Sequence, residues 1–199
     1  MPREPVINYL AQQVADARSW PTDEVVREQL PSIRVYGNIK QPRLRTVLSA
    51  IELRLRSERH EDVSLPARLE IEHVMPRGWR SYWGDDIKGD TDHAARRDIL
   101  INTLGNLTLV TKKLNGTLSN RPWSDLEAAL VAPSGREAGV GKRSLLNGFS
   151  ILVLNKEIVE SHVNIWTEAD IEERAKQLTE AVITIWPRPV PSSANATVS

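Results

Sequence analysis

The sequence predicts a mainly α-helical fold in which a small unit of two strands and one helix is embedded. Apolar residues recur at helical spacing in most of the chain, which favours helices. Between residues 66 and 132 the pattern changes to two short runs of alternating apolar and polar residues, and the second run leads directly into a helical one. We therefore expect an N-terminal helical segment (1–65), a central core (66–132), C-terminal helices packed on that core (133–187) and a disordered tail (188–199).

The apolar spacing also gives bounds for the individual elements. Thr22 precedes one helical run and Ser124 precedes or starts another, and both residue types are good N-caps. The first expected strand runs over Leu69, Ile71 and Val74, and the second covers Leu107 to Val110. The expected helices cover residues 4–19, 23–30, 43–58, 94–102, 112–118, 123–131, 144–162 and 168–186.

The composition excludes several classes of site. The chain has 199 residues and no cysteine, so disulfides, thiolate zinc sites and cysteine nucleophiles are excluded, and a metal must bind oxygen or imidazole. No run approaches the ~20 apolar residues of a membrane span, so we expect a cytoplasmic protein without membrane contact. Lysine plus arginine equals aspartate plus glutamate, at 26 each, so the chain lacks the basic excess of many nucleic-acid binders.

Polar residues gather around the two expected strands. His73 ends the first strand, and histidine is the usual general base at neutral pH. The strand period places Glu72 and His73 on opposite faces, but at a strand end their tips can converge on a bound metal. Asn106 precedes the second strand and Asn115 lies on the following helix, and amide oxygens suit a hard cation.

A strand ending in histidine, a loop, a second strand and a helix with an oxygen ligand resemble the ββα-metal (HNH, His-Me finger) motif. More specifically, the ordered segments IEHVMPRGW and LGNLTLVTKKLNGTLSNRPW, with a closing helix from Trp166 to Trp186, resemble the C-terminal nuclease domain of GmrSD-type (SspE-like) modification-dependent restriction endonucleases. The helix LRTVLSAIELRLRS ahead of the first strand is also similar to that family. The resemblance covers most of the chain.

The resemblance implies roles for individual residues. It makes His73 the general base, Glu72 and Asn115 the metal ligands, and Asn106 the catalytic-site asparagine that braces the loop holding His73, with Asn120 as a further candidate. The implied cofactor is Mg²⁺, Mn²⁺ or another divalent cation. The implied activity is nicking or cleavage of DNA, including modified phage DNA, in bacterial anti-phage defence.

The resemblance also implies a partner. In this family the domain is usually joined to a ParB-like domain that hydrolyses nucleotide and senses modified DNA, and the sequence before Leu44 has no motif of a nucleotide site. Around 131–142 the sequence departs from the family pattern, so Lys142 and Arg143 have no assigned role. Basic residues near the predicted site are candidates for DNA contact, although a solvated helix face explains them equally well: Arg77, Lys112, Lys113 and Arg121.

Other residues favour structural roles. The tryptophans are assigned to the core, although Trp79 and Trp83 with nearby arginines could contact DNA. His60 and His162 stand at helix ends and are expected to be structural or exposed. His93 lies in an acidic loop that could bind a second cation but is more often a solvated turn, with Asp85, Asp86, Asp90 and Asp92.

Two alternative functions stay open at this point. A catalytically inert module that binds DNA or docks a partner is compatible with the zero net charge. A nuclease for RNA or single strands would use the same centre within a different groove.

Overall fold

The computed structural model describes residues 20–58, 64–131 and 138–189. The helix expected at 4–19, His60 and the tail from residue 190 onward lie outside these ranges. Within them, no helix is both long enough and apolar enough to cross a membrane. The helices and strands in chain order are α2 (Asp23–Gln29), α3 (Gln41–Glu58), β1 (Leu69–His73), α4 (Thr91–Leu100), β2 (Leu107–Thr111), α5 (Lys112–Leu118), α6 (Asp125–Leu130), α7 (Lys142–Phe149), α8 (Val153–Ser161) and α9 (Glu168–Ile185).

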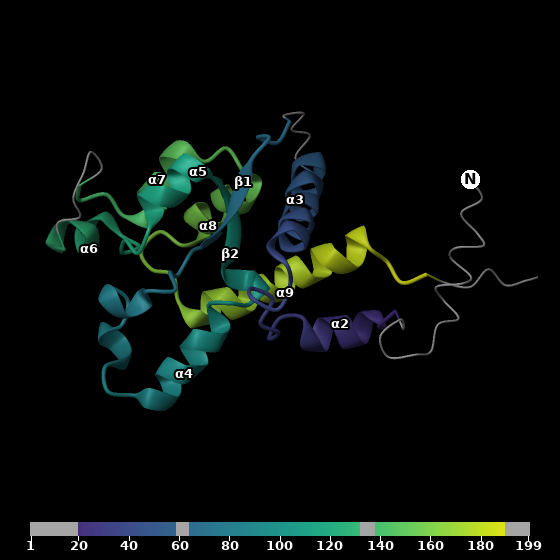
Figure 1. Cartoon of the computed structure of the whole chain (residues 1–199), viewed down its shortest axis with the longest axis horizontal. Coiled ribbons are helices and arrows are strands. Elements are labelled where there is room, and N and C mark those ends of the chain that lie inside the picture. The colour runs from purple at the N-terminus through teal and green to yellow at the C-terminus, as the bar shows by residue number, and fades with distance from the viewer. Residues whose placement is uncertain (1–19, 59–63, 132–137, 190–199) are drawn as a thin grey trace, which may run out of the picture.

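A two-stranded antiparallel sheet lies among the helices, with α3 on one side and α5, α7 and α8 on the other (Figure 1). In its register Leu69 is opposite Thr111, and His73 is opposite Leu107. Helix α5 starts directly after β2, and the side chain of Thr111 caps it by accepting a hydrogen bond from the Leu114 amide. The expected mainly helical class and the expected position of both strands are confirmed.

Both faces of the sheet are covered by helices. Residues directly opposite each other in a sheet lie on the same face, so the register shows which residues each helix covers. Ile71 and Leu109 are opposed and belong to a core with Leu44 and Leu48 of α3. On the other face Val110 packs in a second core with Leu114 of α5. The alternation along β1 therefore sends Glu70 and Glu72 toward α5, and His73 toward the α3 side.

The prediction of a single helix at 144–162 is wrong, because the chain forms α7 and α8 with an extended break between them. At the break, the buried carboxylate of Glu52 accepts hydrogen bonds from the amides of Val153 (3.0 Å) and Leu154 (2.9 Å). Those amides begin α8, whose N-cap Leu152 offers no side-chain acceptor. Arg56 neutralises Glu52 at 2.6 Å. A carboxylate from α3 thus creates the helix start that periodicity did not indicate.

The tryptophan prediction is confirmed in part. Trp79, Trp123 and Trp166 are at most 2% exposed and belong to the core that covers the α5 face. Trp20 is only partly buried. Trp186 is 36% exposed, so its assignment to the core is wrong. It is the C-cap residue of α9, at the end of the packed helix.

The turn before β2 is fixed by close backbone packing against α9. A short 3₁₀ turn, η3 (Leu104–Asn106), contacts α9 extensively. A Cβ at Gly105 would lie 2.0 Å from the Ile171 carbonyl oxygen, so only glycine fits. On the same turn, buried Arg174 of α9 donates to the carbonyls of Gly105 (2.6 Å) and Leu107 (2.9 Å).

Candidate active site

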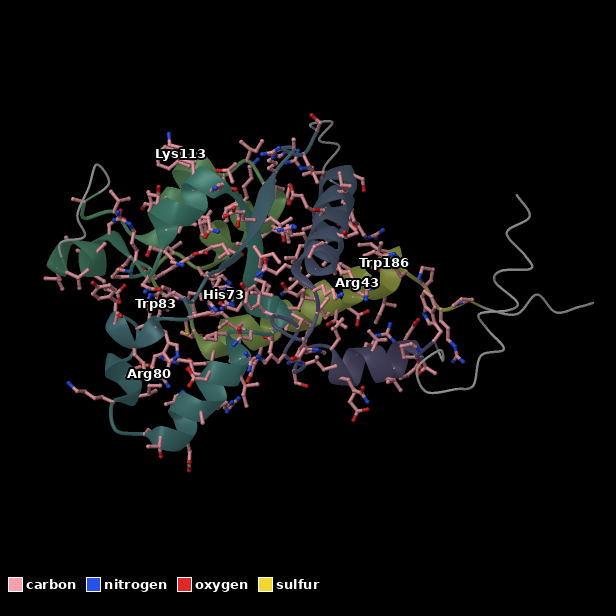
Figure 2. All side chains as sticks on the ribbon, viewed as in Figure 1. Arg43, His73, Arg80, Trp83, Lys113 and Trp186 are labelled. Atoms are coloured by element: carbon pink, nitrogen blue, oxygen red, sulfur yellow. The ribbon has the colours of Figure 1, made fainter. Side chains whose placement is uncertain are left out.

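His73 ends β1 near the centre of the molecule (Figure 2). Its side chain is almost buried, at 7% exposure, and its Nε2 lies 3.3 Å from Oδ1 of Asn102. The ring of Tyr36 meets the imidazole edge-on at 4.5 Å between centroids. Burial lowers the pKa of His73 to about 4, and the nearby charges of Lys142 and Arg77 act in the same direction. The imidazole is therefore neutral at neutral pH and able to accept a proton.

Asn106 braces the loop that follows His73. Its Oδ1 accepts from the Met75 amide at 2.8 Å, and its Nδ2 donates to the carbonyls of Met75 (2.8 Å) and Ile101 (2.9 Å). The indole of Trp166 adds a fourth hydrogen bond, to Oδ1 at 3.2 Å. Asn106 has no exposed surface, so it acts on the position of the loop and not on a substrate.

Glu72 is paired with a buried lysine. The ammonium of Lys142, which starts α7, donates to Oε1 of Glu72 at 2.5 Å and to the carbonyl oxygen of His73 at 2.8 Å. Lys142 has no exposed surface, and burial lowers its pKa while the carboxylate of Glu72 opposes that change. This lysine therefore fixes the Glu72 carboxylate and the backbone of His73 together.

Asn115 of α5 contacts the other glutamate of β1. Its Nδ2 donates to Oε2 of Glu70 at 2.7 Å. The amide nitrogen is thereby committed, which leaves Oδ1 as an acceptor with no partner among the residues that the structure describes. Oε2 of Glu72 likewise has none.

These oxygens suit a hard divalent cation. Carboxylate and amide oxygens are the protein ligands that Mg²⁺ prefers, and Mg²⁺ usually retains several waters with one or two carboxylates. In the described part of the chain, no group of three histidine, aspartate or glutamate side chains is placed to hold a metal. A cation here would therefore depend on few protein ligands, and the carboxylate of Glu72 and the amide oxygen of Asn115 are of the ligand types that such a site uses.

The residues expected to contact DNA differ in exposure. Arg77, Lys112 and Lys113 are exposed, and Lys113 extends from the outer side of α5 (Figure 2). Arg121 is 9% exposed and donates to the carbonyls of Thr117 (2.8 Å) and Val140 (3.1 Å). The guanidinium of Arg121 thus has a structural role.

Asn120 is exposed and its side chain lies against Gly78, in the loop that follows His73. A Cβ at Gly78 would lie 2.6 Å from Nδ2 of Asn120. The residue before it, Ser119, has φ 42°, which is uncommon for a side-chain-bearing residue. Asn120 is therefore near the loop of His73.

Sequence reasoning missed Tyr36 and Asn102, and it assigned no role to Glu70 or Lys142. Lys142 is 70 positions from Glu72 in sequence, so spacing alone could not pair them. The position of Asn102 could have indicated it, because this residue stands at the end of the expected helix, in the segment that leads to Asn106.

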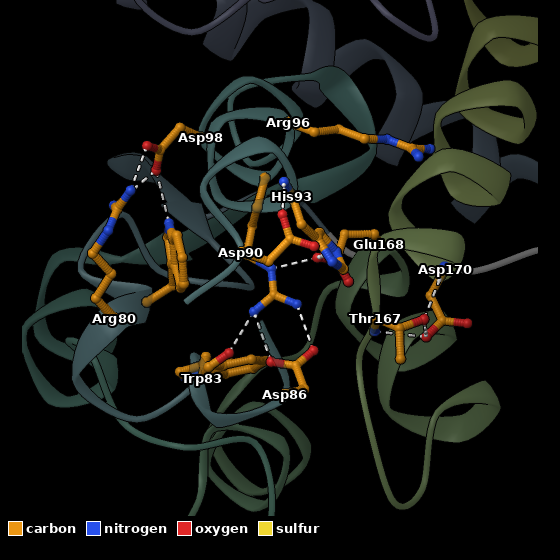
Figure 3. Close-up of polar contacts among 12 residues, drawn as sticks. Arg80, Trp83, Asp86, Asp90, His93, Arg96, Asp98, Thr167, Glu168 and Asp170 are labelled. Atoms are coloured by element: carbon orange, nitrogen blue, oxygen red, sulfur yellow. Dashed lines mark hydrogen bonds and ion pairs between the residues drawn. The ribbon is translucent and has the colours of Figure 1, made fainter. Parts of the chain in front are cut away.

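The acidic loop forms a different cluster, in which Asp86, His93 and Glu168 lie close together (Figure 3). Arg97 bonds to Asp86 and Glu168, and His93 lies 3.0 Å from Glu168. The side chain of Asp90 caps α4. The loop therefore contributes ion pairs and a cap, while the side chain of Asp85 lies outside the described part of the chain.

Residues 20–181 match the family model described as the C-terminal domain of the GmrSD restriction endonucleases. The chain belongs to this family. It is therefore a GmrSD C-terminal domain, for which a nuclease is the activity that the family implies. Comparison with curated proteins and with solved structures gave no match.

Proposed function

We propose that this GmrSD C-terminal domain is a metal-dependent HNH endonuclease domain that nicks or cleaves DNA in bacterial anti-phage restriction. The observation that carries the proposal is the neutral, nearly buried imidazole of His73 at the end of β1, next in sequence to Glu72, whose Oε2 has no partner among the described residues. The order of β1, β2 and α5, with His73 on the first strand and Asn115 on the helix, supports a ββα-metal centre.

His73 acts as the general base that removes a proton from the attacking water. Lys142 orients Glu72 and the backbone of His73, and Asn106 holds the loop beyond them. Glu72 and Asn115 would hold a divalent cation, which would supply charge stabilisation at the scissile phosphate and the departing 3′ oxygen. Arg77, Lys112 and Lys113 contact the DNA backbone.

The test is cleavage of supercoiled plasmid by purified protein with Mg²⁺, Mn²⁺ or EDTA. We expect relaxation or linearisation that requires the cation and falls at least ~100-fold in His73→Ala, since a general base contributes roughly 10²–10⁴-fold. Asn115→Ala should need a higher concentration of metal. His93→Ala is the matched control, because that histidine of α4 pairs with Glu168 of α9, and the variant should retain wild-type cleavage. Equal activity in wild type and folded His73→Ala would indicate contamination.

The second candidate is an inert module that binds DNA or docks a partner. It is favoured by Lys142, which already neutralises one oxygen of Glu72, and by the zero net charge of the chain. It predicts that wild type and His73→Ala bind DNA equally and that neither cleaves with any cation.

A ParB-like, nucleotide-hydrolysing sensor of modified DNA is the proposed partner, so the plasmid test is repeated with that subunit present.

A further inference from the structure

The side-chain amide of Asn102 has a defined orientation. Its Nδ2 donates to the carbonyl oxygen of Asp98 at 2.8 Å, within the last turn of α4. That bond commits the amino group of the amide, so the oxygen atom is the one that faces His73. A carbonyl oxygen can only accept, and Nε2 of His73 must therefore carry the hydrogen.

The backbone of Asn102 holds the second wall of the imidazole site. Its carbonyl oxygen accepts from the amides of Val35 and Tyr36, both at 3.0 Å. Those bonds set the position of the Tyr36 ring, which meets His73 at an interplanar angle of 75°. The Tyr36 hydroxyl accepts from Gln41 at 3.0 Å, which fixes the other end of the ring. Asn102 thus contacts the His73 ring with its side chain and holds Tyr36 with its backbone.

The position of Asn102 is itself rigid. The residue is 5% exposed, and Ile101 beside it is buried in the core on the α5 face. The amide of Asn102 donates to the carbonyl of Ile99 at 3.0 Å, and Ile101 bonds to the side chain of Asn106. The two asparagines therefore connect the imidazole and the loop after it to the same short segment between α4 and β2.

We propose that Asn102 is a positioning residue that keeps His73 in the tautomer protonated on Nε2, so that Nδ1 accepts the proton from water. The inference rests on the proposed function. In that step the water O–H bond breaks and its proton moves to Nδ1, while the water oxygen forms a bond to phosphorus. The bond from phosphorus to the 3′ oxygen breaks, and the departing oxygen takes a proton from solvent.

The first measurement is the ¹⁵N NMR spectrum of protein labelled at histidine imidazoles, in EDTA and near neutral pH. The chain has four histidines, so the His73 signals are identified by their loss in His73→Ala. We expect a protonated Nε2 and an unprotonated Nδ1 in the wild type. A wild-type ring protonated on Nδ1 would overturn the proposal, and this result needs neither a variant at 102 nor any nuclease activity.

The second measurement compares Asn102→Leu with Asn147→Leu, an identical change at an exposed position on α7. Asn102→Leu should give a mixture of tautomers and a kcat lower by ~10–100-fold with little change in KM, as for other residues that orient a reactive histidine. Asn147→Leu should change neither. An unaltered His73 tautomer in folded Asn102→Leu contradicts the proposal. The expected spectra without cleavage in any sample would support the positioning by Asn102 and refute the nuclease alone.

Discussion

Two polar clusters, one around Arg97 and one around His73, differ in how fully their atoms are paired. Arg97 bonds to Asp86, Glu168 and the carbonyl of Trp83, and its guanidinium also lies over the Trp79 ring. Hydrogen bonds from Arg97 hold the pKa of Asp86 below its usual value, and they outweigh burial to do the same for Glu168. In this cluster the guanidinium and both carboxylates are paired with one another.

The cluster around His73 contains acceptor atoms that are unpaired among the described residues. Among the described residues, Oε2 of Glu72 and Oδ1 of Asn115 have no hydrogen-bond partner, and the ring of His73 has only the bond to Asn102. Both oxygens belong to side chains that keep some exposure, so water can reach them and a bound cation could replace that water. The comparison teaches that unused acceptors, more than the density of charge, distinguish a candidate reactive site from a structural ion cluster.

The largest expected difference between the two clusters is in how Mg²⁺ changes the free energy of unfolding when the buried cation of each cluster is removed. Lys142→Met leaves the carboxylate of Glu72 buried without a counter-charge, which should cost about 3–5 kcal/mol of unfolding free energy in EDTA. Mg²⁺ should recover part of that loss, because the cation replaces the lost charge. Urea unfolding with and without Mg²⁺ measures both values.

The matched variant is Arg97→Met, which removes the buried cation of the other cluster. It should lower stability without any added dependence on Mg²⁺, since the carboxylate of Asp86 is largely solvated and Glu168 keeps His93 as a partner. Equal effects of Mg²⁺ on the two variants would show that the His73 cluster is no more open than the Arg97 cluster.

The next effect is on the pH dependence of stability. The pKa of His73 is about 4 when folded, against about 6.5 in an unfolded chain. Between those values the unfolded state binds a proton that the folded state excludes, so stability falls as the pH drops from 6.5 to 4, by on the order of 3 kcal/mol. The lowered pKa of Asp86 and Glu168 instead gives stability that is lost at more acidic pH.

Urea unfolding in EDTA at pH 7 and pH 4.5 checks this prediction. His73→Gln has no imidazole to protonate and should lose less stability across that range than the wild type. The same loss in both proteins would mean that the folded state accommodates a charged His73.

The smallest effect concerns DNA binding at the surface of α5. Replacing Lys112 and Lys113 by alanine in a His73→Ala background should weaken binding uniformly across sequences, and each lost phosphate contact should reduce the salt slope by about 1. Fluorescence anisotropy at several salt concentrations measures the slope. Lys176→Ala, an exposed lysine on α9, is the control. A slope unchanged in the double variant would remove α5 from the DNA interface.

Local patterns were sufficient for the elements around the site. Alternation located β1 and β2, and α5 has the predicted range because β2, the Thr111 cap and the apolar spacing all agree. The resemblance suggested Asn106 as a brace, and its hydrogen bonds have that geometry.

Contacts between distant segments were not predictable in this way. The break before α8 depends on Glu52, 101 positions away from Val153, and the partner of Glu72 is on α7. Periodicity identifies the face of a helix that is buried, but it carries no information about the polar group that meets that face.

The contact of Gly105 with α9 has a consequence for how this site can change in evolution. Since a single methyl group at position 105 would collide with the Ile171 carbonyl, the spacing between the two backbones tolerates less than one carbon atom. The turn that leads into Asn106 is thus positioned by a main-chain contact, so any side chain at position 105 would displace the segment that braces the loop after His73.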